Sequence, residues 1–131
     1  LSQNLVDTYE LSSTDIKLNY NLDEVFLNID SAIPCGLIIN ELISNSLKYA
    51  FVNKSNGVIF IDLHQNSNEV TLRIGDNGIG FPNDIDYKNT DSLGLQLVNT
   101  LVEQLEGNIT LDNSRGATFT IKFKIKDSKD V

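Results

Sequence analysis

Three polar residues in the segment ELISNSLKYA, residues 41–50, have the types and the spacing of groups that do chemistry. Glu41, Asn45 and Lys48 occupy positions i, i+4 and i+7. In a helix these positions place a carboxylate, an amide and an ammonium in one row. An amide oxygen beside a carboxylate suits Mg²⁺, which takes few protein ligands and completes its shell with water and substrate phosphates. An ordinary solvated helix face is the alternative interpretation of the same row.

The residues between these groups favour a functional interpretation. Ser44, Asn45 and Ser46 follow one another in the segment. Serine and asparagine weaken a helix interior because their side chains compete for backbone hydrogen bonds. A face selected only for solvation would carry Glu, Lys and Arg instead. The pattern therefore indicates selection for something other than helix stability.

A second signal is the segment RIGDNGIGFP, residues 73–82. Taken alone, Asp-Asn-Gly after a strand predicts a turn. The second glycine, Gly80, leaves the backbone bare over a longer stretch than a turn needs, and bare backbone lets a flat ligand approach. Asp76 at the end of the strand could accept a hydrogen bond from the exocyclic amine of adenine, whereas the carbonyl of guanine would be repelled.

A third signal is SLGLQLV, residues 92–98, which begins a strongly amphipathic segment. Ser92 is expected to cap the helix, and Gly107 to end it. Gly94 then lies in the first turn, where free N–H groups and the helix dipole form a natural phosphate site. One glycine is weak support on its own. The apolar stripe of this helix consists of Leu97, Val98, Leu101, Val102 and Leu105.

The elements that must position these groups follow from periodicity. Residues 1–11 look like the end of a helix, and the alternation in residues 15–22 and 24–30 predicts two strands. A helix is expected from Pro34 to about Phe51, and a helix from Ser92 to Gly107. Hairpins are expected over 57–76 and 108–126, with a long polar loop over 76–92. Together they predict an α/β (α+β) two-layer sandwich, with a mixed, mainly antiparallel sheet covered on one face by helices.

Composition narrows the function classes. The chain has 131 residues, the size of one domain, and a net charge of −8. This charge disfavours non-specific binding to nucleic acid or to anionic membranes, which is driven by Lys and Arg. Cys35 is the only cysteine, which precludes an internal disulfide and favours a reducing, cytoplasmic setting. We interpret it as a small buried hydrophobe. No apolar run approaches the roughly 18 residues of a membrane span, so no membrane contact by this domain is expected.

The three signals occur in one order, and they are similar to the nucleotide-binding boxes of the GHKL superfamily, which has the Bergerat fold: histidine kinases, gyrase-type topoisomerases, MutL and the heat-shock chaperone ATPases. Over nearly its whole length the chain resembles most closely the catalytic and ATP-binding domain of a sensor histidine kinase. IPCGLIINELISNSLKYAF resembles the asparagine box, DNGIGFP the first glycine box and SLGLQLV a shortened second one. The resemblance implies ATP and Mg²⁺ as ligands.

Carried over residue by residue, the resemblance implies that Asn45 binds Mg²⁺, Lys48 contacts phosphate, Tyr49 lies beside the adenine and Asp76 binds its amine. Thr118 is a candidate adenine contact near the last box, although Ala117 stands where a Thr is often found. The nucleotide-binding residues implied in the two glycine boxes are Gly78, Ile79, Gly80, Leu93, Gly94 and Leu95.

Glu41 has two possible roles under this resemblance. In the chaperone and topoisomerase ATPases a glutamate here polarises the attacking water, and ELISNS is similar to the chaperone version. In a kinase the nucleophile is a histidine of another domain, and Glu41 would hold Mg²⁺-bound water or orient that imidazole. His64, the only histidine, falls in a predicted strand and is expected to be a sheet-surface residue, not a phosphoacceptor.

The phosphoacceptor is therefore expected upstream. Residues 1–11 would end its dimerisation helix, and residues 12–131 would form the catalytic domain. The resemblance implies a monomer in isolation, a homodimeric parent protein and a downstream response regulator. Three alternatives stay open: an ATPase using Glu41 as general base, a kinase acting on serine of a partner protein, and a degenerate interaction module that docks through the loop FPNDIDYKNTDS. The intact Asn45, Lys48 and Asp76 speak against the degenerate module.

Overall fold

A computed structural model describes residues 5–11, 15–50, 56–79 and 92–125. Within these ranges the chain forms six strands, two α-helices and one π-helical turn. In chain order they are β1 (Leu5–Leu11), β2 (Asp15–Leu22), α1 (Ile29–Asn45), the π-helical turn η1 (Ser46–Ala50), β3 (Asn56–Asn66), β4 (Glu69–Asp76), α2 (Leu93–Gln104), β5 (Asn108–Asp112) and β6 (Thr118–Lys124).

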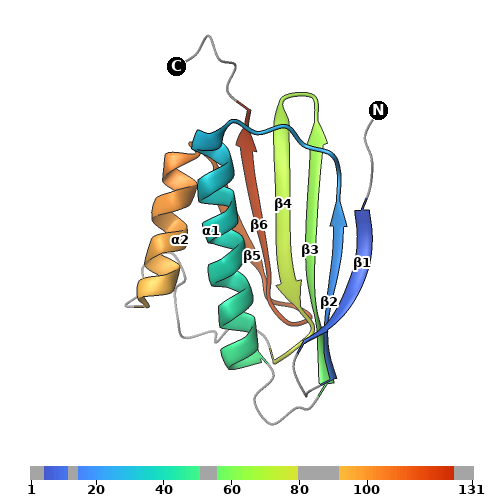
Figure 1. The fold of residues 1–131 in the computed structure, drawn as a ribbon. Coiled ribbons are helices and arrows are strands. Elements are labelled where there is room, and N and C mark those ends of the chain that lie inside the picture. The colour runs from blue at the N-terminus through green and yellow to red at the C-terminus, as the bar shows by residue number, and fades with distance from the viewer. Residues whose placement is uncertain (1–4, 12–14, 51–55, 80–91, 126–131) are drawn as a thin grey trace.

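The strands form one sheet in the order β1-β2-β3-β4-β6-β5. β2 and β3 pair in parallel, and the other four pairings are antiparallel. α1 and α2 lie side by side on one face of this sheet (Figure 1). The predicted two-layer sandwich with a mixed, mainly antiparallel sheet is confirmed. No helix in the described ranges is long and apolar enough to cross a membrane.

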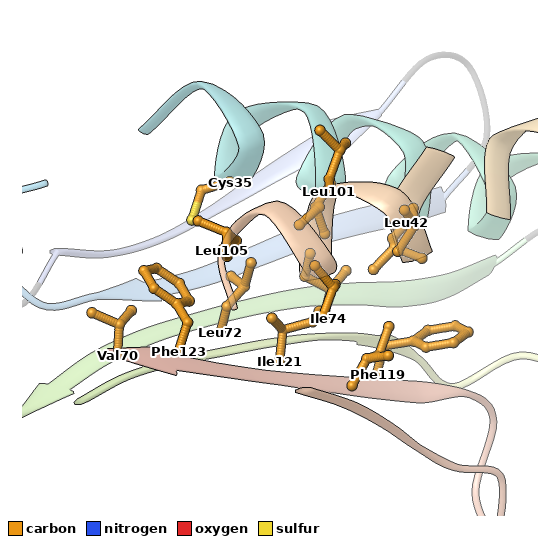
Figure 2. Packing of buried hydrophobic residues seen from close by; sticks show 14 of the residues in the cluster. Cys35, Leu42, Val70, Leu72, Ile74, Leu101, Leu105, Phe119, Ile121 and Phe123 are labelled. Atoms are coloured by element: carbon orange, nitrogen blue, oxygen red, sulfur yellow. The ribbon is translucent and has the colours of Figure 1, made fainter. Parts of the chain in front are cut away.

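The core lies between the helices and the sheet. Alternate residues of β4 and β6 point toward the helices, as the period of two predicts (Figure 2). They meet the buried stripes of α1 and α2, so each strand contributes one face to the core. The residues that Figure 2 labels in this core are Cys35, Leu42, Val70, Leu72, Ile74, Leu101, Leu105, Phe119, Ile121 and Phe123.

The N-terminal third corrects two expectations. The helix expected over residues 1–11 is wrong for residues 5–11, which form β1 and pair antiparallel with β2. The segment LVDTYEL contains Val, Thr and Tyr, which favour strands when a partner strand is available. The strand expected over 24–30 is also wrong, because α1 begins at Ile29. Its N-cap is Asn28, whose Oδ1 accepts a hydrogen bond from the Ser31 N–H at 3.1 Å.

The start of α1 also lies earlier than expected. Pro34 was expected in the first turn, but it lies inside the helix, in its second turn. The next residue, Cys35, is buried against the core, and burial raises the pKa of its thiol to about 11. This supports the interpretation of Cys35 as a small hydrophobe.

The helix α2 has the caps that the sequence predicts, with one difference. At its start the Ser92 Oγ accepts from the Leu95 N–H at 3.4 Å. At its end the Glu106 N–H donates to Glu103 O at 2.9 Å, and the Gly107 N–H to Val102 O at 3.0 Å. This pattern is a Schellman motif. The left-handed residue, however, is Glu106 with φ 55°, one position before the expected glycine.

His64 lies on β3, on the face of the sheet away from the helices. Successive side chains of a strand alternate between the two faces, and Ile59 and Ile61, an odd number of residues away, are buried on the helix side. Its Nδ1 is 2.9 Å from the Asp23 Oδ2. The prediction of a sheet-surface histidine is confirmed.

Candidate nucleotide-binding site

The end of α1 brings the first set of predicted groups to one end of the sheet. Asn45 is the last α-helical residue, and the chain continues through the π-helical turn η1. Such π segments often mark functional sites. Because η1 has a different pitch from an α-helix, the predicted row is regular only from Glu41 to Asn45. Both are half-buried, and Lys48 is exposed. The side chain of Tyr49 lies outside the described part of the chain.

Asp76 is the centre of the site. It is the last residue of β4, and its side chain is 4% exposed. Its Oδ1 accepts the N–H groups of Gly78 at 3.0 Å and Ala117 at 3.4 Å. Its Oδ2 accepts the hydroxyl of Ser46 at 2.8 Å. Such donors offset the cost of removing a carboxylate from water.

Ser46 was not predicted as a site residue. Where burial is described, Ser46 and Asp76 are the two polar side chains that are buried, and they bond to each other. One signal in the sequence could have found it. Ser46 comes four residues after Leu42, so in a helix it shares the core-facing side with that residue. A polar residue on this side needs a buried partner.

The backbone around Asp76 is fixed by two other contacts. The Asn77 Oδ1 accepts from the Val58 N–H at 2.8 Å, and the Asn77 N–H donates to Val58 O at 3.1 Å. Asn77 therefore ties the loop to β3. On the other side Gly116 has φ +78°, and a Cβ there would lie 2.1 Å from the Asp76 carbonyl oxygen. Only glycine fits this approach of two backbones.

The remaining residues of the first glycine box are only partly described. Gly78 contributes its N–H to Asp76. Ile79 is 63% exposed, so it is open to a ligand or to solvent. Gly80 lies outside the described residues.

The start of α2 lies beside Glu41. A Cβ at Gly94 would stand 2.7 Å from the Glu41 Oε2, so the carboxylate occupies the space that glycine leaves. A carboxylate near a helix N-terminus is favoured by the helix dipole. Leu93 is exposed, whereas the side chain of Leu95 is buried in the core. Only the backbone of Leu95 can therefore face the site.

The structure corrects the expectation for Thr118. This residue pairs with Gly75, and its Oγ1 lies 2.6 Å from the position of a Gly75 Cβ, beside Phe60. Neighbouring residues of a strand point to opposite faces. Because Asp76 points toward the helices, Thr118 lies on the other face of the sheet and cannot contact a ligand held by Asp76. The neighbouring Ala117 reaches Asp76 instead, through its N–H.

The donors for a metal are few. Among the described residues there is no group of three or more His, Cys, Asp and Glu side chains that could hold an ion. Asn45 and Glu41 lie one helical turn apart on α1. An amide and one carboxylate fit Mg²⁺ that arrives with phosphates and keeps several waters, and they do not fit an all-protein cage.

A family model and several named relatives match most of this chain. The family model for "Histidine kinase-, DNA gyrase B-, and HSP90-like ATPase" matches residues 31–127. Blue-light-activated histidine kinase 2 of Erythrobacter litoralis is 33% identical over 107 residues, which cover 81% of this chain and 30% of that protein. Sensor histidine kinase PdtaS of Mycobacterium tuberculosis is 30% identical over 110 residues, covering 81% of this chain and 22% of that protein.

A solved structure shows the same fold. The Erythrobacter litoralis EL346 blue-light activated histidine kinase superposes with a TM-score of 0.82 at 27% identity, over 88% of this chain and 37% of that chain. The chain thus spans less than a third of the length of the two relatives above. Since the family model covers most of the chain, the chain belongs to the histidine kinase-, DNA gyrase B- and HSP90-like ATPases, a family of ATP-binding domains.

Proposed function

We propose that this chain is the catalytic domain of a sensor histidine kinase, and that it transfers the γ-phosphate of ATP to a histidine on an upstream domain. The observation that carries this proposal is the buried carboxylate of Asp76 at the C-terminal end of β4, which accepts hydrogen bonds from three separate segments. An ionised carboxylate only accepts hydrogen bonds, which suits the exocyclic amine of adenine. The matched relatives named above are histidine kinases.

The chemistry asks the protein mainly for positioning and charge neutralisation. An imidazole nitrogen attacks the γ-phosphorus, the bond to the bridging oxygen of ADP breaks, and ADP leaves. Asp76 would hold the adenine, and Lys48 would contact the phosphates. Glu41, which lies against Gly94, would orient the incoming imidazole.

A metal completes this scheme. Mg²⁺ bound with ATP would neutralise part of the phosphate charge, and the amide oxygen of Asn45 would be its protein ligand. Thr118 is no longer assigned to the adenine. The proposed partners are dimerisation and phosphoacceptor helices upstream and a response regulator downstream. The proposed setting is the cytoplasm, with a homodimeric parent protein and a monomeric catalytic domain.

Calorimetric titration of Mg²⁺-ATP into the domain tests the nucleotide site, with Mg²⁺-GTP as the comparison. We expect ATP to bind and GTP not to bind, and Asp76→Asn to abolish ATP binding because the amide places a donor where the amine must donate. Asp62→Asn is the matched control, since Asp62 pairs with Arg73 on the opposite face of the sheet at 3.6 Å. Equal binding of ATP and GTP would contradict the adenine pocket, and no binding at all would favour the degenerate interaction module.

One contact favours a second function, ATP hydrolysis with Glu41 as general base. The Glu41 carboxylate lies at the N-terminus of α2, where phosphates are expected, and could activate a water there. Steady release of phosphate by the isolated domain, lost in Glu41→Ala, would support hydrolysis. Acid-labile phosphohistidine formed by the full-length protein, together with negligible release by the domain, would support the kinase.

A further inference from the structure

The hydrogen bonds around Asp76 leave a limited number of places for a ligand. An ionised carboxylate offers about four lone-pair positions, two on each oxygen. Oδ1 accepts from the backbone N–H groups of Gly78 and Ala117, so both of its positions are used. Oδ2 accepts from the hydroxyl of Ser46, so one of its positions remains. The amine of a bound adenine therefore has to donate to the oxygen that Ser46 already holds.

We propose that Ser46 is a positioning residue for nucleotide selection: its hydroxyl fixes the Asp76 Oδ2 so that the remaining lone pair meets the exocyclic amine of adenine. This inference rests on the proposed function, which places adenine at Asp76. The hydroxyl hydrogen of Ser46 is committed to Asp76. Because a hydroxyl has only one hydrogen, Ser46 cannot also donate to the carbonyl oxygen of guanine.

The location of Ser46 explains how it can do this. It is the first residue of η1, directly after Asn45, and it is buried beneath the end of α1. The bond to Asp76 spans 30 residues of sequence and links the helix layer to the end of β4. The other two donors to Asp76 are backbone N–H groups, which only a substitution to proline would remove. The hydrogen bond from Ser46 is therefore the one bond to Asp76 that a conservative side-chain substitution can remove alone.

The test compares two ligands that differ by one group: ATP and purine riboside triphosphate, which lacks the exocyclic amine. Both are titrated with Mg²⁺ into the unmodified domain and into Ser46→Ala. We expect Ser46→Ala to weaken ATP binding about three- to tenfold, because Oδ2 is then no longer held in line with the amine and the hydrogen bond from the amine is partly lost. Binding of purine riboside triphosphate should change by less than about twofold, because it makes no bond to Oδ2.

Two variants keep this test sharp. Ser44→Ala removes a hydroxyl two residues earlier in α1 and should leave both affinities unchanged. Ser46→Cys nearly preserves the shape of the side chain but replaces the hydroxyl by a weak donor. It should give the same ligand pattern as Ser46→Ala, and it carries the test if the alanine variant does not fold.

The outcomes separate this inference from the proposed function. If the unmodified domain binds ATP but the Ser46 variants leave it unchanged, or weaken both ligands equally, the positioning role is refuted and the nucleotide site stands. If the unmodified domain binds neither ligand, the proposed function fails and this inference fails with it. Weaker binding of ATP alone supports the inference.

Discussion

The most demanding prediction concerns the glycine that lies against Asp76. In Gly116→Ala the new Cβ would lie 2.1 Å from the Asp76 carbonyl oxygen, 2.9 Å from its carbonyl carbon and 3.0 Å from the Asn77 Cα. All three are backbone atoms, so no side chain can rotate away. The separation would have to grow by nearly 1 Å to reach the 3.0 Å that real contacts respect. The β5–β6 turn and the end of β4 must therefore move apart.

The cost can be estimated from two contributions. An L-residue in the left-handed region at φ +78° costs about 1–2 kcal/mol. Separating the two segments also weakens the bond from the Asp76 N–H to Ala117 O, now 3.0 Å, which is worth about 1 kcal/mol. We expect Gly116→Ala to lower the free energy of unfolding by about 2–3 kcal/mol. ATP binding should weaken as well, because Ala117 also donates to Oδ1.

Urea unfolding of the two matched variants Gly116→Ala and Gly36→Ala is the assay. Gly36 lies inside α1, and a Cβ there would meet no atom within 4 Å. Gly36→Ala should therefore raise the free energy of unfolding by about 0.5–1 kcal/mol, since alanine loses less entropy in a helix. If Gly116→Ala cost less than about 1 kcal/mol, the close approach of the turn to β4 would be refuted.

Two further predictions concern the helices. Glu106→Gly should raise the free energy of unfolding by about 1 kcal/mol, because Glu106 adopts the left-handed conformation that glycine prefers, and urea unfolding measures it. The thiol of Cys35 has a folded-state pKa of about 11 against 9.0 when exposed, so the unfolded state loses this proton first. Stability should therefore fall between pH 9 and pH 11 by up to about 3 kcal/mol in the unmodified domain relative to Cys35→Ala.

The fold was predictable where local periodicity matched the tertiary contacts. α2 and the two C-terminal hairpins carry clean apolar stripes and turn residues, and they lie close to the expected positions. The N-terminal segments did not follow this logic. β1 is a strand because β2 offers it a partner, which no local pattern reports. α1 begins at the Asn28 cap, and the alternation in residues 24–30 obscured that signal.

In the site, too, local motifs were predictable and contacts between distant segments were not. Asp76 and Gly78 belong to one short motif, so the sequence could place them side by side. The bond between Ser46 and Asp76 joins segments 30 residues apart, so a motif cannot display it. The predicted adenine contact of Thr118 was wrong for another reason. A single position along a strand decides which face a side chain takes, and the register opposite Gly75 turns Thr118 away from the helices.

The order of the strands also determines how this domain can assemble. The sheet consists of three hairpins, β1–β2, β3–β4 and β5–β6, and each can close through a short turn. The hairpins are joined by two further strand pairings, β2 with β3 and β4 with β6. In each of these pairings a helix lies between the two strands in the sequence. Such long closures are the slow steps of folding.

The proposed nucleotide site depends on both of these pairings. Ser46 follows the helix of the first, and the contact of Asp76 with Ala117 belongs to the second. The site is therefore complete only when both pairings have formed. ATP that binds only the native state should then leave the folding rate nearly unchanged and slow the unfolding rate, so a nucleotide would protect the domain by keeping its last-formed contacts closed.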